Sequence, residues 1–258
     1  MQRNMYDTDV TVWSPQGRLL QVEYAGEAVK QGSATLGLTS NTHVVLAALK
    51  RSPHELASFQ KKLLKIDDHI AVGIAGLNAD ARSLAKYMRT ECLNHKYVYG
   101  SPMQGSRLVT DVADKHQRCT QMYVRRPYGV GMLMGVVDGT GPHLYETEPS
   151  GAFHEYVAMA IGARAQSAKT YLEKFMAEFP EADSEAMIKH SLKALSGCVQ
   201  TDKQLEASNT CVVVIGPDQK LTMIEDAALQ PYLDAIELEG DMPANDGDAG
   251  GDVDAMAT

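Results

Sequence analysis

The sequence alternates groups of strand-like segments with pairs of amphipathic helices, and this order restricts the folds that the chain can adopt. Residues 43–50 contain the nearly continuous apolar run VVLAAL, which is typical of a strand buried on both faces. Residues 78–122 and 163–199 carry apolar side chains at helical spacing, and each stretch predicts two consecutive helices. Two sheets packed face to face, with one helix pair on each outer side, bury all of these apolar faces. The sequence therefore predicts an α+β fold, a four-layer αββα sandwich.

The expected elements follow from these patterns and from the turn residues between them. Asn78 is the predicted N-cap of the first long helix, because its side chain can accept a hydrogen bond from the helix backbone. The predicted strands span residues 33–40, 43–50, 63–66, 69–75, 129–137, 142–147, 153–161, 209–215 and 221–225. The predicted helices span residues 18–30, 78–97, 106–122, 163–179, 181–199 and 231–238.

The helix predicted over residues 18–30 lies outside the alternation and gives the sandwich an extra amino-terminal helix. Its apolar residues recur at three- and four-residue spacing, and Gly32 is a plausible end. Before it, Ser14-Pro15-Gln16-Gly17 predicts a turn, because proline fixes its own φ and glycine tolerates almost any φ. We therefore divide the chain into an irregular segment over residues 1–17, a single domain over 18–236 and a tail over 237–258.

The negative charge of the chain is concentrated in this tail. The formal net charge is −9, and residues 237–258 hold seven acidic residues and no Lys or Arg, which leaves −2 for the remainder. A nearly neutral body does not favour nucleic acid as a partner. The tail offers little to bury, so we expect it to be disordered. It is either a solvated acidic segment or a docking site for a basic partner.

The sequence predicts no membrane segment, no metal site and no cofactor. No apolar run is long enough to cross a bilayer, and the first ten residues lack the apolar core of a signal peptide, so we expect a soluble, intracellular chain. The four cysteines stand apart from one another and from ligand-spaced histidines, which predicts reduced thiols. The glycines of residues 129–137 have the spacing G-x-G-x-x-x-G and precede no helix, so this run is interpreted as a strand and not as a dinucleotide-binding loop.

Four motifs form a near-continuous series close to the amino terminus. They are YD at residues 6–7, SPxGR at 14–18, QVEYAxEAV at 21–29 and GSxTxGL at 32–38. The series is similar to the amino-terminal signature of alpha-type subunits of the 20S proteasome core, and compatible features continue to about residue 225. The resemblance implies the fold of the amino-terminal nucleophile hydrolases. It also implies that residues 1–17 form a gate segment at the axial pore.

Beta-type proteasome subunits use this fold to cut peptide bonds, so the resemblance raises the question whether the present chain is an enzyme. Their mechanism needs a free amino-terminal threonine whose own amine helps as a base, together with a lysine and an aspartate. The matching positions are Ser33, Lys62 and Leu49. Ser33 follows 32 residues, so its nitrogen is an amide, and Leu49 has no carboxylate. We therefore expect no catalytic residue in this chain, and proteolysis in partner beta subunits.

Two alternatives to a noncatalytic subunit stay open. Active relatives cleave themselves after a glycine, and Gly32-Ser33 has this form, although cleavage would discard the signature and would leave Leu49 in place. A self-processed hydrolase would lack residues 1–32. A free scaffold protein that uses its acidic tail and outer helix would occur outside any large particle.

The resemblance implies a gate cluster formed by Tyr6, Asp7, Pro15 and Tyr24. In the family the matching residues hold the open conformation of the pore. The chemistry is suitable, because tyrosine hydroxyls and a carboxylate can hydrogen-bond one another and a proline stiffens the hinge.

The resemblance also implies an activator-tail pocket lined by Lys62, Gly32 and Leu77. In the family this pocket lies between adjacent alpha subunits, where the lysine pairs with the terminal carboxylate of an activator. The implied partners are other alpha-type and beta-type subunits in a 28-subunit barrel, a regulatory particle or other activators, and unfolded protein substrates. The implied setting is ubiquitin-dependent and other protein degradation in the cytoplasm and nucleus.

Overall fold

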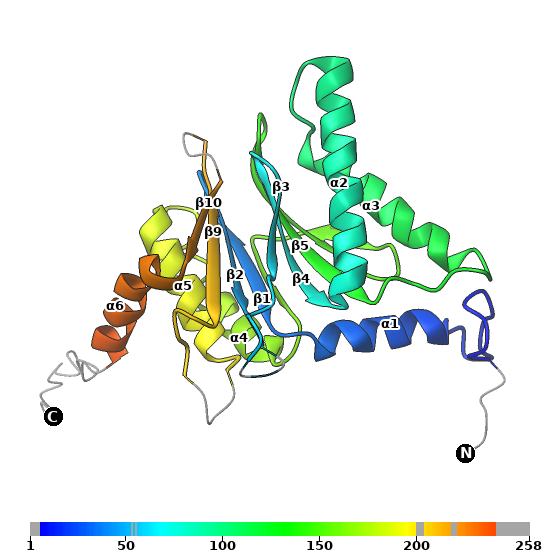
Figure 1. Ribbon diagram of the computed structural model, residues 1–258, viewed down its shortest axis with the longest axis horizontal. Helices are drawn as coiled ribbons and strands as arrows, with labels where there is room; N and C mark the ends of the chain where they lie inside the picture. Colours follow the sequence, from blue (N-terminus) through cyan, green and yellow to red (C-terminus); the bar gives the residue numbers. More distant parts are fainter. Residues whose placement is uncertain (1–5, 53, 55, 200–203, 218–220, 241–258) are drawn as a thin grey trace, which may run out of the picture.

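The computed structural model of the chain describes residues 6–52, 54, 56–199, 204–217 and 221–240. Two sheets lie face to face and helices cover the outer side of each, so the molecule has four layers (Figure 1). The predicted αββα sandwich is therefore confirmed. The predicted disorder of the tail concerns mainly residues 241–258, which lie outside the described residues.

The first sheet has the strand order β10-β9-β2-β1-β8, and every neighbouring pair is antiparallel. Its inner strands β2 and β9 are buried along almost their whole length, and for β2 the run VVLAAL predicted this. The five strands are β1 (Thr35–Thr39), β2 (Val44–Leu49), β8 (Ala158–Ile161), β9 (Thr210–Ile215) and β10 (Thr222–Glu225).

The second sheet is an antiparallel series in the order β3-β4-β5-β6-β7. Its strands are β3 (Leu63–Asp67), β4 (Ile70–Gly76), β5 (Val130–Asp138), β6 (Gly141–Thr147) and β7 (Phe153–Glu155). The two sheets approach closely at Gly73, where an added Cβ would lie 2.4 Å from the Thr35 Cγ2 atom. A glycine at this position therefore permits the close packing of the sheets.

Each helix pair packs on one sheet, as the sequence order predicted. The helices α2 (Asn78–Tyr99) and α3 (Gly105–Thr120) cover the second sheet, and α4 (Ala165–Phe175) and α5 (Ser184–Ser196) cover the first (Figure 1). A short 3-10 turn, η1 (Asp226–Ala228), leads into α6 (Gln230–Gly240), which packs beside α5. Apolar side chains fill all three interfaces between the layers.

The amino-terminal helix α1 (Leu20–Gln31) lies outside the sandwich, across the ends of β4 and β5 (Figure 1). Leu20 and Ala25 are its buried residues. Near its carboxyl end the Val29 side chain lies so close to Gly131 that an added Cβ would be 2.8 Å away. The helix thus closes one edge of the space between the sheets.

Three local predictions were wrong. Residues 153–161 form two strands and not one, because the chain passes from the second sheet to the first after Glu155. The helix predicted over residues 163–179 is shorter, since α4 ends at Phe175. Asn78 is the first residue of α2 and not its cap, because the N-cap is Leu77, whose side chain makes no capping hydrogen bond.

The described residues contain neither a candidate membrane-spanning helix nor a candidate metal-binding cluster. No described helix combines the length and the apolar character that crossing a bilayer requires. Within the same residues, no group of three or more His, Cys, Asp and Glu side chains could hold a metal ion.

Candidate functional site

The segment before α1 is attached to the helix through Asp7. The Gln21 side-chain amide donates to the Asp7 backbone carbonyl, and the Tyr24 hydroxyl donates to the Asp7 carboxylate at 3.3 Å. Tyr24 is 48% exposed, and its pKa is raised, first by partial desolvation and then by the Asp7 carboxylate. Tyr6 is half-buried next to Asp7. Of the predicted gate cluster, the structure therefore brings Asp7 and Tyr24 into contact.

The predicted turn at Ser14-Pro15-Gln16-Gly17 is confirmed. The Gly17 amide donates to the Ser14 carbonyl at 2.9 Å, and the Ser14 hydroxyl accepts from the Arg18 amide at 3.1 Å. Gly17 has a φ of 75°, a left-handed conformation that glycine adopts without strain. Pro15 lies exposed at the corner of this turn. Its ring fixes the backbone conformation ahead of α1.

An ion pair that the sequence did not predict lies beside this turn. The Arg18 guanidinium forms an ion pair with the Glu23 carboxylate, and its Nε atom donates to both carboxylate oxygens, at 2.9 and 3.0 Å. This contact lowers the pKa of Glu23 and raises that of Arg18. Arg18 ends the SPxGR motif and Glu23 lies in the QVEYAxEAV motif. Their short separation in the sequence is the signal from which this ion pair could have been predicted. The pair connects the turn to the first turns of α1.

The three positions that match the beta-type catalytic machinery lie close together at one end of the space between the sheets. The Leu49 amide donates to the carbonyl of Ala34, the residue after Ser33. Lys62 lies near Cys211 of β9. In the β2–β9 ladder Cys211 pairs with Ala48, the residue before Leu49. Ser33 is buried two residues after the end of α1, and Leu49 has a hydrocarbon side chain. The arrangement therefore lacks both the free amine and the carboxylate that the mechanism needs.

Lys62 is unusual because it is a lysine that is only 3% exposed. Burial lowers its pKa to about 8, and the charge of Arg51 contributes in the same direction. Within the described part of the chain, no carboxylate forms an ion pair with Lys62. The side chain is therefore a buried cation without an internal counter-charge.

Gly32 and Leu77 lie together at the end of β4. A Cβ on Gly32 would lie 2.2 Å from the Gly76 amide nitrogen, directly before Leu77, so only glycine fits there. Leu77 is 49% exposed, and its amide donates to the Gly129 carbonyl at 2.8 Å. The carbonyl of Lys62 accepts from the amide of Ile74, two residues before Gly76. The predicted pocket residues thus surround the carboxyl end of β4.

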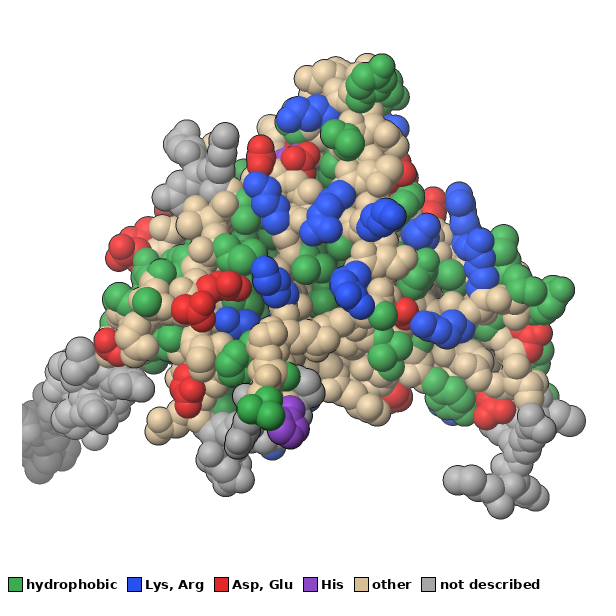
Figure 2. Space-filling model, viewed as in Figure 1, with side chains coloured by type: hydrophobic (Ala, Val, Ile, Leu, Met, Phe, Trp, Pro, Cys, Tyr) green, Lys and Arg blue, Asp and Glu red, His purple; other side chains and the backbone are tan. Residues whose placement is uncertain are grey.

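Lys and Arg side chains gather on the face over β3 and α2 (Figure 2). The exposed members from these elements and the preceding loop are Arg51, Lys61, Lys65, Arg82, Lys86 and Arg89. Arg89 joins the two elements, because its guanidinium donates to the Lys65 carbonyl at 2.9 and 2.7 Å. The buried Lys62 therefore lies beside a surface of positive charge, which attracts anionic groups.

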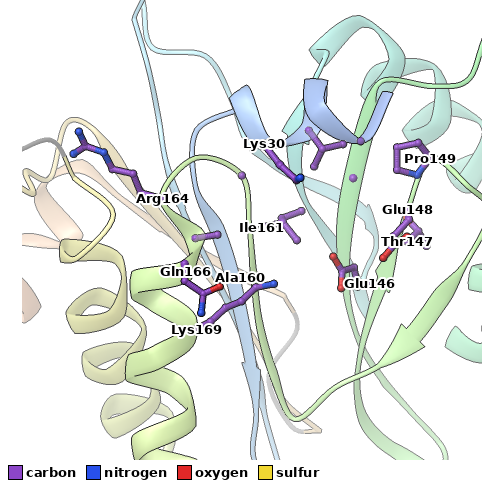
Figure 3. A pocket seen from close by; sticks show the side chains of 15 residues that line it. Lys30, Glu146, Thr147, Glu148, Pro149, Ala160, Ile161, Arg164, Gln166 and Lys169 are labelled. Carbon is purple, nitrogen blue, oxygen red and sulfur yellow. The ribbon is translucent and has the colours of Figure 1, made fainter. Parts of the chain in front are cut away.

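A cavity of about 500 Å³ lies beside α1, between this helix, β6, β8 and the start of α4 (Figure 3). No sequence pattern indicated it, because the lining residues of α1 lie more than 100 positions before the others. Glu146 of β6 is buried in its wall, and Lys30 and Lys169 stand at its sides.

Two family descriptions match the chain and together span most of it. The amino-terminal signature of A-type proteasome subunits matches residues 6–28, and the general description "Proteasome subunit" matches residues 29–215. The chain belongs to the alpha-type proteasome subunits. The signature match covers the turn, most of α1 and the Asp7–Tyr24 contact of this proteasome subunit.

Curated relatives agree with this assignment over nearly the full length of both chains. "Proteasome subunit alpha type-1" of Dictyostelium discoideum is 52% identical over 93% of this chain and 97% of its own length. "Probable proteasome subunit alpha type-6" of Schizosaccharomyces pombe is 50% identical over 93% and 88%, and "Proteasome subunit alpha type-1" of Drosophila melanogaster is 47% identical over 95% and 90%. The motifs WSPQGR, VKQGSAT and RRPYGVG are likewise similar to those of the eukaryotic sixth alpha subunit.

Proposed function

We propose that this chain is a noncatalytic subunit of the outer alpha ring of the 20S proteasome. It builds the ring of a 28-subunit barrel together with other alpha-type and beta-type subunits. Unfolded protein substrates enter along the axis and are cut in beta subunits. The setting is ubiquitin-dependent and other protein degradation in the cytoplasm and nucleus.

The observation that carries this proposal is that Ser33 is buried and that the Gly32 carbonyl before it is hydrogen-bonded within the fold. Ser33 is 6% exposed, and the Gly32 carbonyl before it accepts a hydrogen bond from the Ala163 amide at 2.7 Å. The peptide bond that would have to break is thus part of the packed structure. Its cleavage would release α1, which covers the ends of β4 and β5. Leu49 would still supply no carboxylate, so processing would not create an active site.

The gate proposal rests on the contact between Asp7 and Tyr24. Asp7 accepts hydrogen bonds from Gln21 and Tyr24 of α1, and Val10 of the same segment is buried. The Tyr24 hydroxyl lies on a half-exposed side chain, so its hydrogen bond to Asp7 can break and re-form at an energetic cost of about 1 kcal/mol. We infer that residues 1–17 contribute to an axial gate, whose open conformation the Tyr6, Asp7, Pro15 and Tyr24 cluster holds.

The docking proposal rests on the uncompensated charge of Lys62. An activator tail that ends in a carboxylate would supply the missing anion, beside Gly32 and Leu77. The positive surface over β3 and α2 would favour the approach of such a tail. We therefore assign the regulatory particle and other activators as partners of this pocket.

The experiment that tests the proposed function is native mass measurement of the particle that carries this chain, followed by the intact mass of the chain itself. We expect a particle of hundreds of kilodaltons with several related chains, and a chain that keeps residues 1–32. A monomer, or a ring of this chain alone, would contradict the ring proposal. Loss of residues 1–32 would contradict the noncatalytic proposal and favour a self-processed hydrolase.

A further inference from the structure

The cavity beside α1 is a candidate binding site for a group from another molecule. It is lined on one side by Gly26, Val29 and Lys30 of α1, and on the other by β6 and by the β8–α4 connection (Figure 3). Its walls are largely apolar, with Val29 and Ile161 among them. A space of about 500 Å³ is large enough for a long side chain together with part of its backbone.

The polar group in this apolar surround is the carboxylate of Glu146. Glu146 is 9% exposed, and its pKa is raised, first by burial and then by the neighbouring charge of Glu148. The Tyr156 hydroxyl donates a hydrogen bond to the carboxylate. Among the described residues no cation forms an ion pair with it. A buried carboxylate without a cation destabilises a fold, so a cation brought to this position gains a strong interaction.

The cations of this chain that line the cavity do not fill this role. The Lys30 ammonium pairs with Glu27 at 2.7 Å, and the Arg164 guanidinium donates to the Val199 carbonyl at 2.8 Å. Lys169 acts on Glu146 through space but forms no ion pair with it. Among the described residues, therefore, no side chain neutralises the Glu146 carboxylate by an ion pair.

We propose that this cavity receives a lysine or arginine side chain of a neighbouring alpha-type subunit, with its cationic group at Glu146. The aliphatic stem of such a side chain suits the apolar walls, and its head suits the carboxylate. The inference rests on the proposed place of the chain in a ring. A closed ring of subunits needs two different complementary surfaces on each member, and this cavity forms part of one of them.

Gly26 allows a sharp test, because it lines the cavity and a Cβ built on it meets no atom within 4 Å. Gly26→Met places a long side chain into the space, whereas the matched control Gly26→Ala leaves most of it empty. Both replacements improve helix propensity, so both variants should fold at least as well as the parent chain. Glu146→Gln removes the charge with little change in shape, and Glu173→Gln on the exposed face of α4 is its control.

The measurement is competition for places in the particle. Each variant is co-expressed with the parent chain, the two carry different tags, and their ratio in purified particles is counted by mass spectrometry. We expect Gly26→Met and Glu146→Gln to be depleted at least about tenfold, as expected for loss of a buried charge pair. Gly26→Ala and Glu173→Gln should be incorporated as well as the parent. Melting curves of the isolated variants confirm that each is folded.

Other outcomes would overturn the inference in distinct ways. Equal incorporation of Gly26→Met and Gly26→Ala would mean that no group enters the cavity. Depletion of Gly26→Met with full incorporation of Glu146→Gln would mean that the entering group is not a cation. Depletion of Lys169→Gln to the level of Glu146→Gln would identify Lys169 as the counter-ion. Absence of the parent chain from every particle would refute the proposed function itself, and the inference with it.

Discussion

Replacing Lys62 by methionine should make the isolated chain more stable. The side chain is 3% exposed, and burial together with Arg51 lowers its pKa from 10.5 to about 8. The folded chain therefore disfavours the ammonium form that water favours. Methionine keeps a straight apolar side chain of similar length and removes the charge, so the Lys62→Met substitution should relieve this penalty while the packing is kept.

The size of the effect follows from the shift in pKa. A difference of about 2.5 units corresponds to about 3 kcal/mol at 1.36 kcal/mol per unit. Because the folded-state pKa lies below the unfolded-state value, the penalty is fully present below about pH 8. It disappears as the pH rises through 10.5, and above that pH the lysine is deprotonated in both states. Lys62→Met should therefore raise the free energy of unfolding by about 3 kcal/mol at pH 7, and by much less near pH 10.5.

Urea unfolding followed by circular dichroism measures this difference at both pH values. The matched control is Lys61→Met, because Lys61 is the exposed neighbour of Lys62 in the sequence, and its replacement should change the unfolding free energy by less than about 0.5 kcal/mol. A Lys62→Met chain no more stable than the parent at pH 7 would refute the reasoning, since Lys62 would then have a compensating partner within the chain. In the assembled particle the same substitution should weaken activator-stimulated peptide hydrolysis, because the tail carboxylate loses its cation.

Three further predictions concern single contacts. Burial lowers the pKa of His116 from 6.5 to about 4. The unfolding free energy should therefore fall by about 3 kcal/mol as the pH drops from 6.5 to 4, because the unfolded chain binds the proton more readily. Urea titrations of His116→Phe should show a weaker dependence of the unfolding free energy on pH. Asp183 accepts from the Ala186 amide at 2.8 Å as the N-cap of α5, so Asp183→Ala should lower the unfolding free energy by about 1 kcal/mol, and a thermal melt without any change would contradict the capping role. Tyr24→Phe removes the hydrogen bond to Asp7, worth about 1 kcal/mol, and should reduce activator-stimulated peptide hydrolysis by up to about fivefold, while the melting temperature of the chain should fall by no more than about 4 °C.

The sandwich could be predicted from sequence because its central strands are unambiguous. Residues 44–49 and 211–215 are continuous apolar runs, and a strand buried on both faces produces that pattern. The split of residues 153–161 could not be predicted in the same way. Local alternation is similar on both sides of the break, and only the tertiary structure sends β7 to one sheet and β8 to the other.

For the candidate sites, too, local sequence predicted some features, and others depended on the tertiary structure. Tyr24 and Lys62 were found because they stand within motifs, but their sequence positions gave no measure of exposure. The motifs did not predict that Lys62 is buried without a counter-charge, since that follows from β3, β4 and β9 coming together. Glu146 was missed altogether. It lies in an ordinary strand, and its environment depends on α1 and α4, which are distant in the sequence.

Lys62 and Glu146 pose the same physical problem with opposite charge. Each is a buried ionisable residue without an ion-pair partner in the described part of the chain, and each lowers the stability of the isolated protein. Lys62 lies near the end of β4, and Glu146 lies in the cavity between α1 and α4. If both are neutralised by other molecules, the two penalties become binding energy that the folded monomer cannot obtain alone. A chain with Lys62→Met and Glu146→Gln together should then be more stable than the parent as a monomer and less able to enter the particle. Such opposite effects on stability and on assembly would be difficult to explain if either residue served only the fold.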